Sequence, residues 1–142
     1  MKNLVVCLFC IVVSPSLPAQ STQDFGNYVV RCNAISTMQL PAAMTKQYGI
    51  ERAARRGLLN VSVESKTAEG HTVNAVVTAQ VGDLTGHDKP VVIRETSENG
   101  DIDYLGEFPI DGSGTYVFTV KVSPSGQTPP FVVKFTQDLS VD

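Results

Sequence analysis

Apolar residues alternate with polar ones along much of this chain, and this period of two constrains the fold more than any other feature. The longest run spans residues 73–81, where five apolar side chains are interleaved mostly with polar ones such as Thr78 and Gln80. Successive side chains of a β-strand point to opposite faces, so the run predicts a strand with one buried and one solvated face. The pattern therefore predicts an all-β domain.

Seven segments show this alternation or the β-branched and aromatic composition that is typical of strands. They lie at residues 25–33, 59–63, 73–81, 91–96, 102–110, 116–122 and 131–137. Most are joined by short turns, including Asn99-Gly100, a hairpin signal because both residue types tolerate positive φ. Parallel neighbours would need long connections, so we expect antiparallel pairing. Seven strands in about 110 residues predict an immunoglobulin-like antiparallel β-sandwich, with a small barrel as the alternative.

One short helix is expected, between the first two predicted strands. Pro41 can occupy the first turn of a helix, and good helix formers follow it up to Tyr48. Gly49 then supplies a C-terminal stop. The sequence predicts a two-turn helix over residues 41–48.

The N-terminus has the composition of a secretory signal peptide. Lys2 precedes an unbroken apolar run at residues 4–13, and the small residue Ala19 follows a helix-breaking stretch. The run covers ten residues, whereas a membrane-spanning helix needs roughly 20. We therefore predict a signal peptide at residues 1–19, one domain at residues 20–142, and no stable membrane anchor after cleavage.

The predicted mature chain is mildly acidic and retains one cysteine. It carries ten basic and fourteen acidic residues, which argues against nucleic acid as a partner because such binding demands a basic face. Cys32 lies on the same strand side as Tyr28 and Val30, which favours a buried, inert thiol. An intermolecular disulfide and a reactive or metal-binding thiol are the alternatives.

No catalytic or cofactor-binding spacing is present in the sequence. The two histidines, His71 and His87, lie at opposite ends of the predicted strand at residues 73–81, so they cannot share a metal within one monomer. Zinc-binding, nucleophile-elbow and phosphate-loop motifs are missing from the sequence. We therefore expect a protein that is not an enzyme and that uses no cofactor.

Carboxylates near His87 form a weaker candidate for a cation site. Asp83 and Asp88 flank this histidine in the sequence, and Asp101 or Asp103 could approach it in the fold. The favoured interpretation is a solvated loop in which Asp and Gly form turns.

Basic residues follow the predicted helix and form the candidate ligand-binding site. Arg52, Arg55 and Arg56 lie on the connector behind Tyr48, and guanidinium groups form paired hydrogen bonds to carboxylate or phosphate. The alternative is that these arginines serve solubility and local ion pairs with Glu51 or Glu64.

An ordered series of short motifs resembles the domain-of-unknown-function family 4426, a group of small exported proteobacterial proteins. The motifs span nearly the whole predicted mature chain: Asp24–Val30, Tyr48–Ile50, Arg56–Val63, Leu84–Gly86, Ile93–Glu95, Tyr104–Phe108 and Phe135–Gln137. The resemblance implies a periplasmic immunoglobulin-like β-sandwich and brings no mechanism with it. The family pattern has an aromatic residue where this chain has Cys32, so a family-wide role for the thiol is not implied.

The leading functional hypothesis is a non-enzymatic periplasmic domain that binds another protein or an envelope component. It follows from the lack of catalytic spacing and from the predicted sandwich, since such domains can recognise partners by strand addition at a sheet edge. The sequence does not indicate which edge is open. The alternative is a small anionic-ligand binder that uses Tyr48, Arg52, Arg55 and Arg56. The sequence gives no indication of an oligomeric state.

Overall fold

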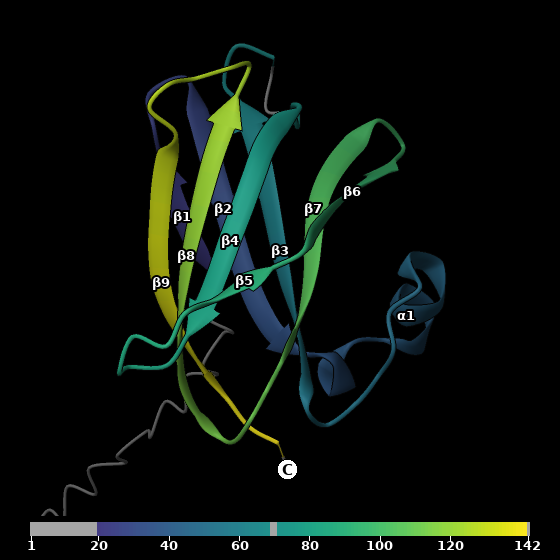
Figure 1. The fold of residues 1–142 in the computed structure, drawn as a ribbon. Helices are drawn as coiled ribbons and strands as arrows, with labels where there is room; N and C mark the ends of the chain where they lie inside the picture. The colour runs from purple at the N-terminus through teal and green to yellow at the C-terminus, as the bar shows by residue number, and fades with distance from the viewer. Residues whose placement is uncertain (1–19, 69–70, 142) are drawn as a thin grey trace, which may run out of the picture.

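Two antiparallel sheets face each other and enclose one apolar core (Figure 1). The computed structural model describes residues 20–68 and 71–141. The predicted signal peptide at residues 1–19 lies outside the described residues. The sandwich architecture agrees with the fold class predicted from the alternating pattern.

Sheet A has five strands and sheet B has four. The order in sheet A is β1 (Ser21–Asp24), β2 (Tyr28–Ser36), β3 (Arg56–Ser65), β7 (Asp101–Pro109) and β6 (Ile93–Glu98). The order in sheet B is β5 (Lys89–Val91), β4 (Ala75–Gly82), β8 (Gly114–Pro124) and β9 (Phe131–Leu139). A 3₁₀ turn, η1 (Thr37–Gln39), and the helix α1 (Ala42–Tyr48) connect β2 to β3.

All seven predicted strands are present, and the described residues contain two more. The short β1 is additional: the turn at Gly26, where φ is 78°, reverses the chain so that β1 pairs with β2. This turn also delays the start of β2 to Tyr28, three residues after the predicted start at Phe25. The predicted strand at residues 91–96 is divided into β5 and β6, which belong to different sheets.

The division of that strand is a crossing from one sheet to the other. β5 pairs with β4 in sheet B, and after Val92 the chain continues as β6 beside β7 in sheet A. Val92 is 86% exposed at the crossing. The strand passes close over Gly106, where an added Cβ would lie 2.5 Å from Val91 Cγ1 and 2.7 Å from Ile93 Cδ1. Glycine at this position gives the crossing strand its space.

The core lies between the sheets and follows the predicted alternation. Val30 and Cys32 of β2 and Val61 of β3 are fully buried, opposite Val120 and Phe118 of β8. The Phe118 ring stacks on Phe135, with centroids 4.9 Å apart, and meets the Phe108 ring edge-on at 5.2 Å. The absence of an intramolecular disulfide among the described residues fits this apolar packing, with Cys32 as a free buried thiol.

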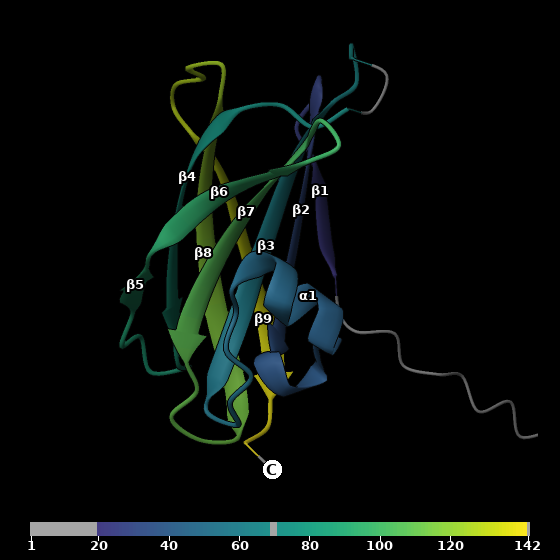
Figure 2. The same cartoon turned by 90° about the vertical axis from the view of Figure 1, so that its right-hand side faces the viewer.

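Helix α1 lies on the outer face of sheet A (Figure 2). It begins one residue after Pro41 and ends at Gly49, which adopts the left-handed conformation with φ of 64°. The contact is a second apolar cluster, separate from the main core. The cluster contains the buried residues Leu40, Ile50, Leu58 and Leu105, with Ile35, Met44 and Tyr48 packed against them. The predicted helix is therefore confirmed, and η1 precedes it.

Candidate binding site

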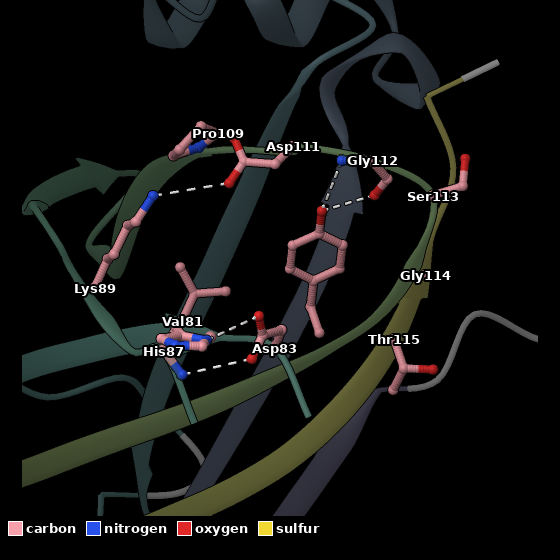
Figure 3. A pocket seen from close by; sticks show the side chains of 12 residues that line it. Val81, Asp83, His87, Lys89, Pro109, Asp111, Gly112, Ser113, Gly114 and Thr115 are labelled. Carbon is pink, nitrogen blue, oxygen red and sulfur yellow. Dashed lines mark hydrogen bonds and ion pairs between the residues drawn. The ribbon is translucent and has the colours of Figure 1, made fainter. Parts of the chain in front are cut away.

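The loops at one end of the sandwich enclose a cavity of about 560 Å³, which we call the loop-end cavity (Figure 3). Its walls come from residues within 81–89, which join β4 to β5, and from residues within 109–116, which join β7 to β8. The two segments meet because β4 and β7, in opposite sheets, both end at this side of the sandwich. Val81, Pro109 and Tyr116 supply apolar surface, and charged side chains lie around them.

An Asp-Thr-His network shapes the β4–β5 wall. Asp83 Oδ1 accepts hydrogen bonds from Thr85 Oγ1 at 2.5 Å, from Thr85 N at 2.8 Å and from His87 N at 3.4 Å. These bonds, led by the one from the Thr85 hydroxyl, lower the pKa of Asp83 to about 2. The carboxylate therefore stays charged at any physiological pH.

The same network assigns the histidine tautomer. His87 Nδ1 lies 2.6 Å from Thr85 Oγ1 and 3.5 Å from Asp83 Oδ2. The Thr85 hydroxyl has one proton and donates it to Asp83, so Nδ1 of His87 carries the hydrogen that it shares with Thr85 and Asp83. Whenever the ring is neutral, Nε2 is then its acceptor, on a side chain that is 79% exposed.

A second acid–base pair spans the cavity from one wall to the other. Lys89 Nζ lies 3.7 Å from Asp111 Oδ2, and the two side chains are 65% and 77% exposed. At this distance and exposure the pair contributes between nothing and about 1 kcal/mol. Both groups are therefore available to a ligand at low cost.

Hydrogen bonds hold the β7–β8 wall in place. Tyr116 OH donates to Gly112 O at 2.7 Å and accepts from Gly112 N at 3.2 Å. Arg55 Nη1 donates to Asp111 O at 2.6 Å, and Ile110 N donates to Arg55 O at 2.9 Å. This wall is preorganised, since bonds from β8 and from the β3 connector fix its backbone.

The four residues predicted to bind an anion are divided between several places. Arg55 and Arg56 line a second cleft, of about 380 Å³, together with Glu107, Phe108 and Pro109. This cleft adjoins the loop-end cavity, because Pro109 lines both.

Tyr48 and Arg52 are not among the residues that line either space. Tyr48 OH donates to Glu98 Oε2 at 2.6 Å, which raises the pKa of Tyr48, and the Tyr48 carbonyl accepts from Arg94. Arg52 Nη2 donates to Met38 O at 2.8 Å, beside η1. Arg56 Nη1 pairs with Glu51 at 2.9 Å, as the solubility and ion-pair alternative anticipated.

The predicted carboxylate cluster around His87 is also divided. Asp83 lies beside His87, and Asp88 packs over Gly82, where an added Cβ would be 2.0 Å from Asp88 Oδ1. Asp101 and Asp103 lie at the start of β7, whereas the loop-end cavity adjoins its end. The two histidines flank opposite ends of β4, as predicted.

Lys89, Asp111 and Tyr116 were not singled out from the sequence. The sequence predicts only a turn at residues 111–114 and a loop around Lys89. The available signal was topological: two loops that follow strands in facing sheets at the same end of a sandwich lie close together.

Neither a bilayer-spanning helix nor a metal-ligand group occurs in the described residues. Within 20–68 and 71–141, no helix is long and apolar enough to cross a membrane. No three His, Cys, Asp or Glu side chains in these ranges are grouped so that they could hold a metal ion.

Three solved structures share this fold over most of the chain. A DUF4426 family protein from Pseudomonas aeruginosa PAO1 is 33% identical, with a TM-score of 0.73 over 87% of this chain and 96% of that one. FetP from uropathogenic Escherichia coli strain F11, expressed in the periplasm, is 12% identical, with a TM-score of 0.61 over 87% of this chain and 95% of FetP. A copper-bound FetP variant gives a TM-score of 0.58 at 12% identity, over 85% and 95% of the two chains. At this identity the likeness to FetP shows the fold alone.

The family comparison covers nearly the whole described domain. No curated protein matches the chain. The family model for the domain of unknown function DUF4426 matches residues 22–142, which include every motif quoted above for the resemblance. The chain therefore belongs to the DUF4426 family.

Proposed function

We propose that this protein is a non-enzymatic binding module of the bacterial periplasm that recognises another protein or an envelope component at the loop-end cavity. One observation carries the proposal: a cavity of about 560 Å³ between two loops, one of them pinned by the Tyr116 and Arg55 hydrogen bonds. Its volume lies in the range of about 300 to 1,000 Å³ that is usual for ligand sites.

The chemistry of the rim supports a partner that presents both charges and an apolar group. Lys89 and the Nε2 acceptor of His87 lie across the cavity from Asp111, and each charged side chain is exposed. Leu84, on the same loop as His87, is 74% exposed. A protein segment offers charged and apolar side chains in this combination more readily than a small inorganic ion does.

Site-directed photo-crosslinking tests the proposal. A photoreactive amino acid replaces Leu84, which adjoins the wall residue Asp83, in one variant and Ser113, which lines the opposite wall, in another. The control places it at Lys121, on the outer face of sheet B. We expect bacterial envelope extract to give the same crosslinked species at both cavity positions and not at the control.

A second set of variants makes the result specific. His87→Ala combined with Lys89→Ala should abolish the crosslink, whereas Lys66→Ala, after β3 at the opposite end of the sandwich, should leave it unchanged. Equal crosslinking at Lys121, or crosslinks that survive the double replacement, would contradict the proposal.

The proposed location follows from the N-terminal sequence. The charged, apolar and small-residue order of residues 1–19 supports export and cleavage after Ala19. Protein purified from the periplasmic fraction should then begin at Gln20, as read by N-terminal sequencing. A chain that retains Met1 would refute this location.

A second candidate function uses the neighbouring cleft. Arg55 and Arg56 both line it, which favours an anionic group between them. Anion binding is the less favoured function because both guanidinium groups already have partners. Arg55 donates to Asp111 O, and Arg56 Nη1 pairs with Glu51 and lies 3.7 Å from Glu107 Oε1. Inorganic phosphate or citrate should raise the melting temperature, and Arg55→Ala with Arg56→Ala should remove the shift. An unchanged shift rules the cleft out.

A further inference from the structure

We propose that β9 is the contact edge of a symmetric dimer, in which two copies of this chain pair their β9 strands antiparallel about Thr136. The pairing would join the two copies of sheet B into one continuous sheet. The proposal is independent of the loop-end cavity, because it uses no residue that lines it.

Three of the four sheet edges are protected against strand pairing in the described residues. β1 has only four residues, and β5 has three, one of which is Pro90. β6 carries Arg94, Glu95 and Glu98, and its Arg94 and Glu98 side chains are bonded to Tyr48 of helix α1. Short length, proline, charge and covering elements are the usual means by which edges avoid pairing.

The fourth edge, β9, is neither short nor interrupted by proline, and its two charged residues, Lys134 and Asp138, are of opposite sign. It runs for nine residues, contains no proline, and pairs one-to-one with β8 from Phe131 to Leu139 without a bulge. Figure 1 shows it as the outermost strand of sheet B, at the margin of the sandwich. A long, regular edge of this kind is a template for another strand.

The charges on β9 select one register for self-pairing. Lys134, Thr136 and Asp138 all point to the outer face, since Val133, Phe135 and Leu139 face the core. Antiparallel pairing about Thr136 places Lys134 of each copy opposite Asp138 of the other. Seven residues of each strand, 133–139, then overlap, with two identical cross-strand ion pairs that the symmetry makes reciprocal.

Other registers lack this complementarity. Centring the pair on residue 134 would oppose the two lysines, and centring it on residue 135 would place Lys134 opposite Thr136. If the two-fold axis passed between two neighbouring residues, each core-facing side chain would lie opposite an outward-facing one of the other copy. The side-chain period of two excludes such a register. Within the described residues, Lys134 makes no ion pair or hydrogen bond, so its ammonium group is available.

Cysteine crosslinking tests the register. In the proposed dimer the two Thr136 Cα atoms lie about 4.5 to 5.5 Å apart, which is within disulfide range. Thr136→Cys should therefore form a covalent dimer on mild oxidation. Val132→Cys, on the same strand and face, should not, because its counterpart would be on the order of 27 Å away. Equal crosslinking of both variants, or none, overturns the register.

Charge reversal tests the same contact without a disulfide. The edge is small, so we expect a weak dimer, seen by sedimentation equilibrium at high micromolar concentration. Lys134→Glu alone or Asp138→Lys alone should weaken it by roughly tenfold or more, and the two together should restore it. Lys121→Glu, on the outer face of β8, is the control and should leave the dimer intact.

The outcomes separate a self-pairing edge from its alternatives. A wild-type chain that stays monomeric at every concentration, or a dimer that neither single charge reversal weakens, would overturn the proposal. Thermal melts of each variant at low concentration exclude unfolding as the cause, since Asp138 also accepts a hydrogen bond from Thr115.

Discussion

At the scale of single residues, Cys32 shows how far alternation alone can predict burial. Its place on one strand side with Tyr28 and Val30 predicted a core position, and the structure places it opposite Val61 with no exposed surface. Burial raises the pKa of the thiol to about 12. The thiol is therefore neutral and unreactive in the folded protein, which disfavours the reactive and intermolecular alternatives.

Replacing this thiol should show what its environment tolerates. Cys32→Ser is expected to lower the free energy of unfolding by about 1 to 3 kcal/mol, because it buries a hydroxyl group among apolar side chains. Cys32→Ala should cost less, since it adds no polar group. Urea unfolding of both variants measures the difference. Equal costs, or rapid labelling of the wild-type thiol without denaturant, would argue against this environment.

Asp103 gives a pH-dependent prediction. Its pKa is raised, first by burial and then by Asp101 and Glu98. The folded state therefore favours the protonated carboxyl, and this contribution to stability is lost as the pH rises through the raised pKa. Asp103→Asn should raise the melting temperature at pH 7 by roughly 1 to 2 °C and change it little at pH 3. A gain of the same size at pH 3 would refute this origin.

At the scale of elements, local sequence signals correctly predict the turns and the helix end, because these features depend on residues that are neighbours in the sequence. Asn99 and Gly100 have φ of 51° and 85°, as the hairpin signal requires, and α1 ends at Gly49 as expected. The crossing from sheet B to sheet A at Val92 could not be predicted from the sequence. The alternation of side chains through residues 91–96 is the same whether these residues belong to one sheet or to two. Only Gly106, in another strand, creates the space for the crossing.

A similar close approach, between the Gly57 backbone and the Phe108 ring, occurs within sheet A. A Cβ at this position would lie 2.3 Å from the Phe108 ring, which faces it in the β3–β7 register. Gly57→Ala is expected to cost about 1 to 3 kcal/mol by overpacking. Gly114→Ala is the matched control, since nothing lies within 4 Å of its Cβ position.

A double-mutant cycle in urea identifies the cause of that cost. Combining Gly57→Ala with Phe108→Leu should cost less than the sum of the two single replacements, because the smaller side chain gives the new methyl group room. Additive costs would show that the ring is not what excludes a side chain at position 57.

At the scale of the whole molecule, the candidate site depends on contacts that no local pattern contains. Lys89 and Asp111 face each other because β4 and β7, in different sheets, end at the same side of the sandwich. The arginine connector was predicted as a unit from its spacing. In the fold, Arg52 donates to Met38 O beside η1, whereas Arg55, which donates to Asp111 O, and Arg56 line the cleft. The arginines separate because their guanidinium groups bond to different acceptors.

The two apolar clusters imply two levels of stability in the molecule. Leu105 of β7 and Ile50 after α1 belong to the small cluster under the helix, whereas Val120 of β8 belongs to the main core. The Ile50 amide, bonded to Thr45 O at 2.8 Å, reports on the helix segment. With few buried side chains, this segment should open without unfolding the sandwich.

Hydrogen exchange distinguishes such local opening from global unfolding. Leu105→Ala should accelerate exchange of the Ile50 amide by roughly 30-fold or more, since it removes the contact that opening breaks. Val120→Ala should accelerate exchange in β8 and leave Ile50 unchanged, because the core stays intact when only the helix segment opens. If Val120→Ala accelerates both equally, helix and sandwich unfold as one unit, and α1 is then an integral part of the domain that holds the loop-end cavity.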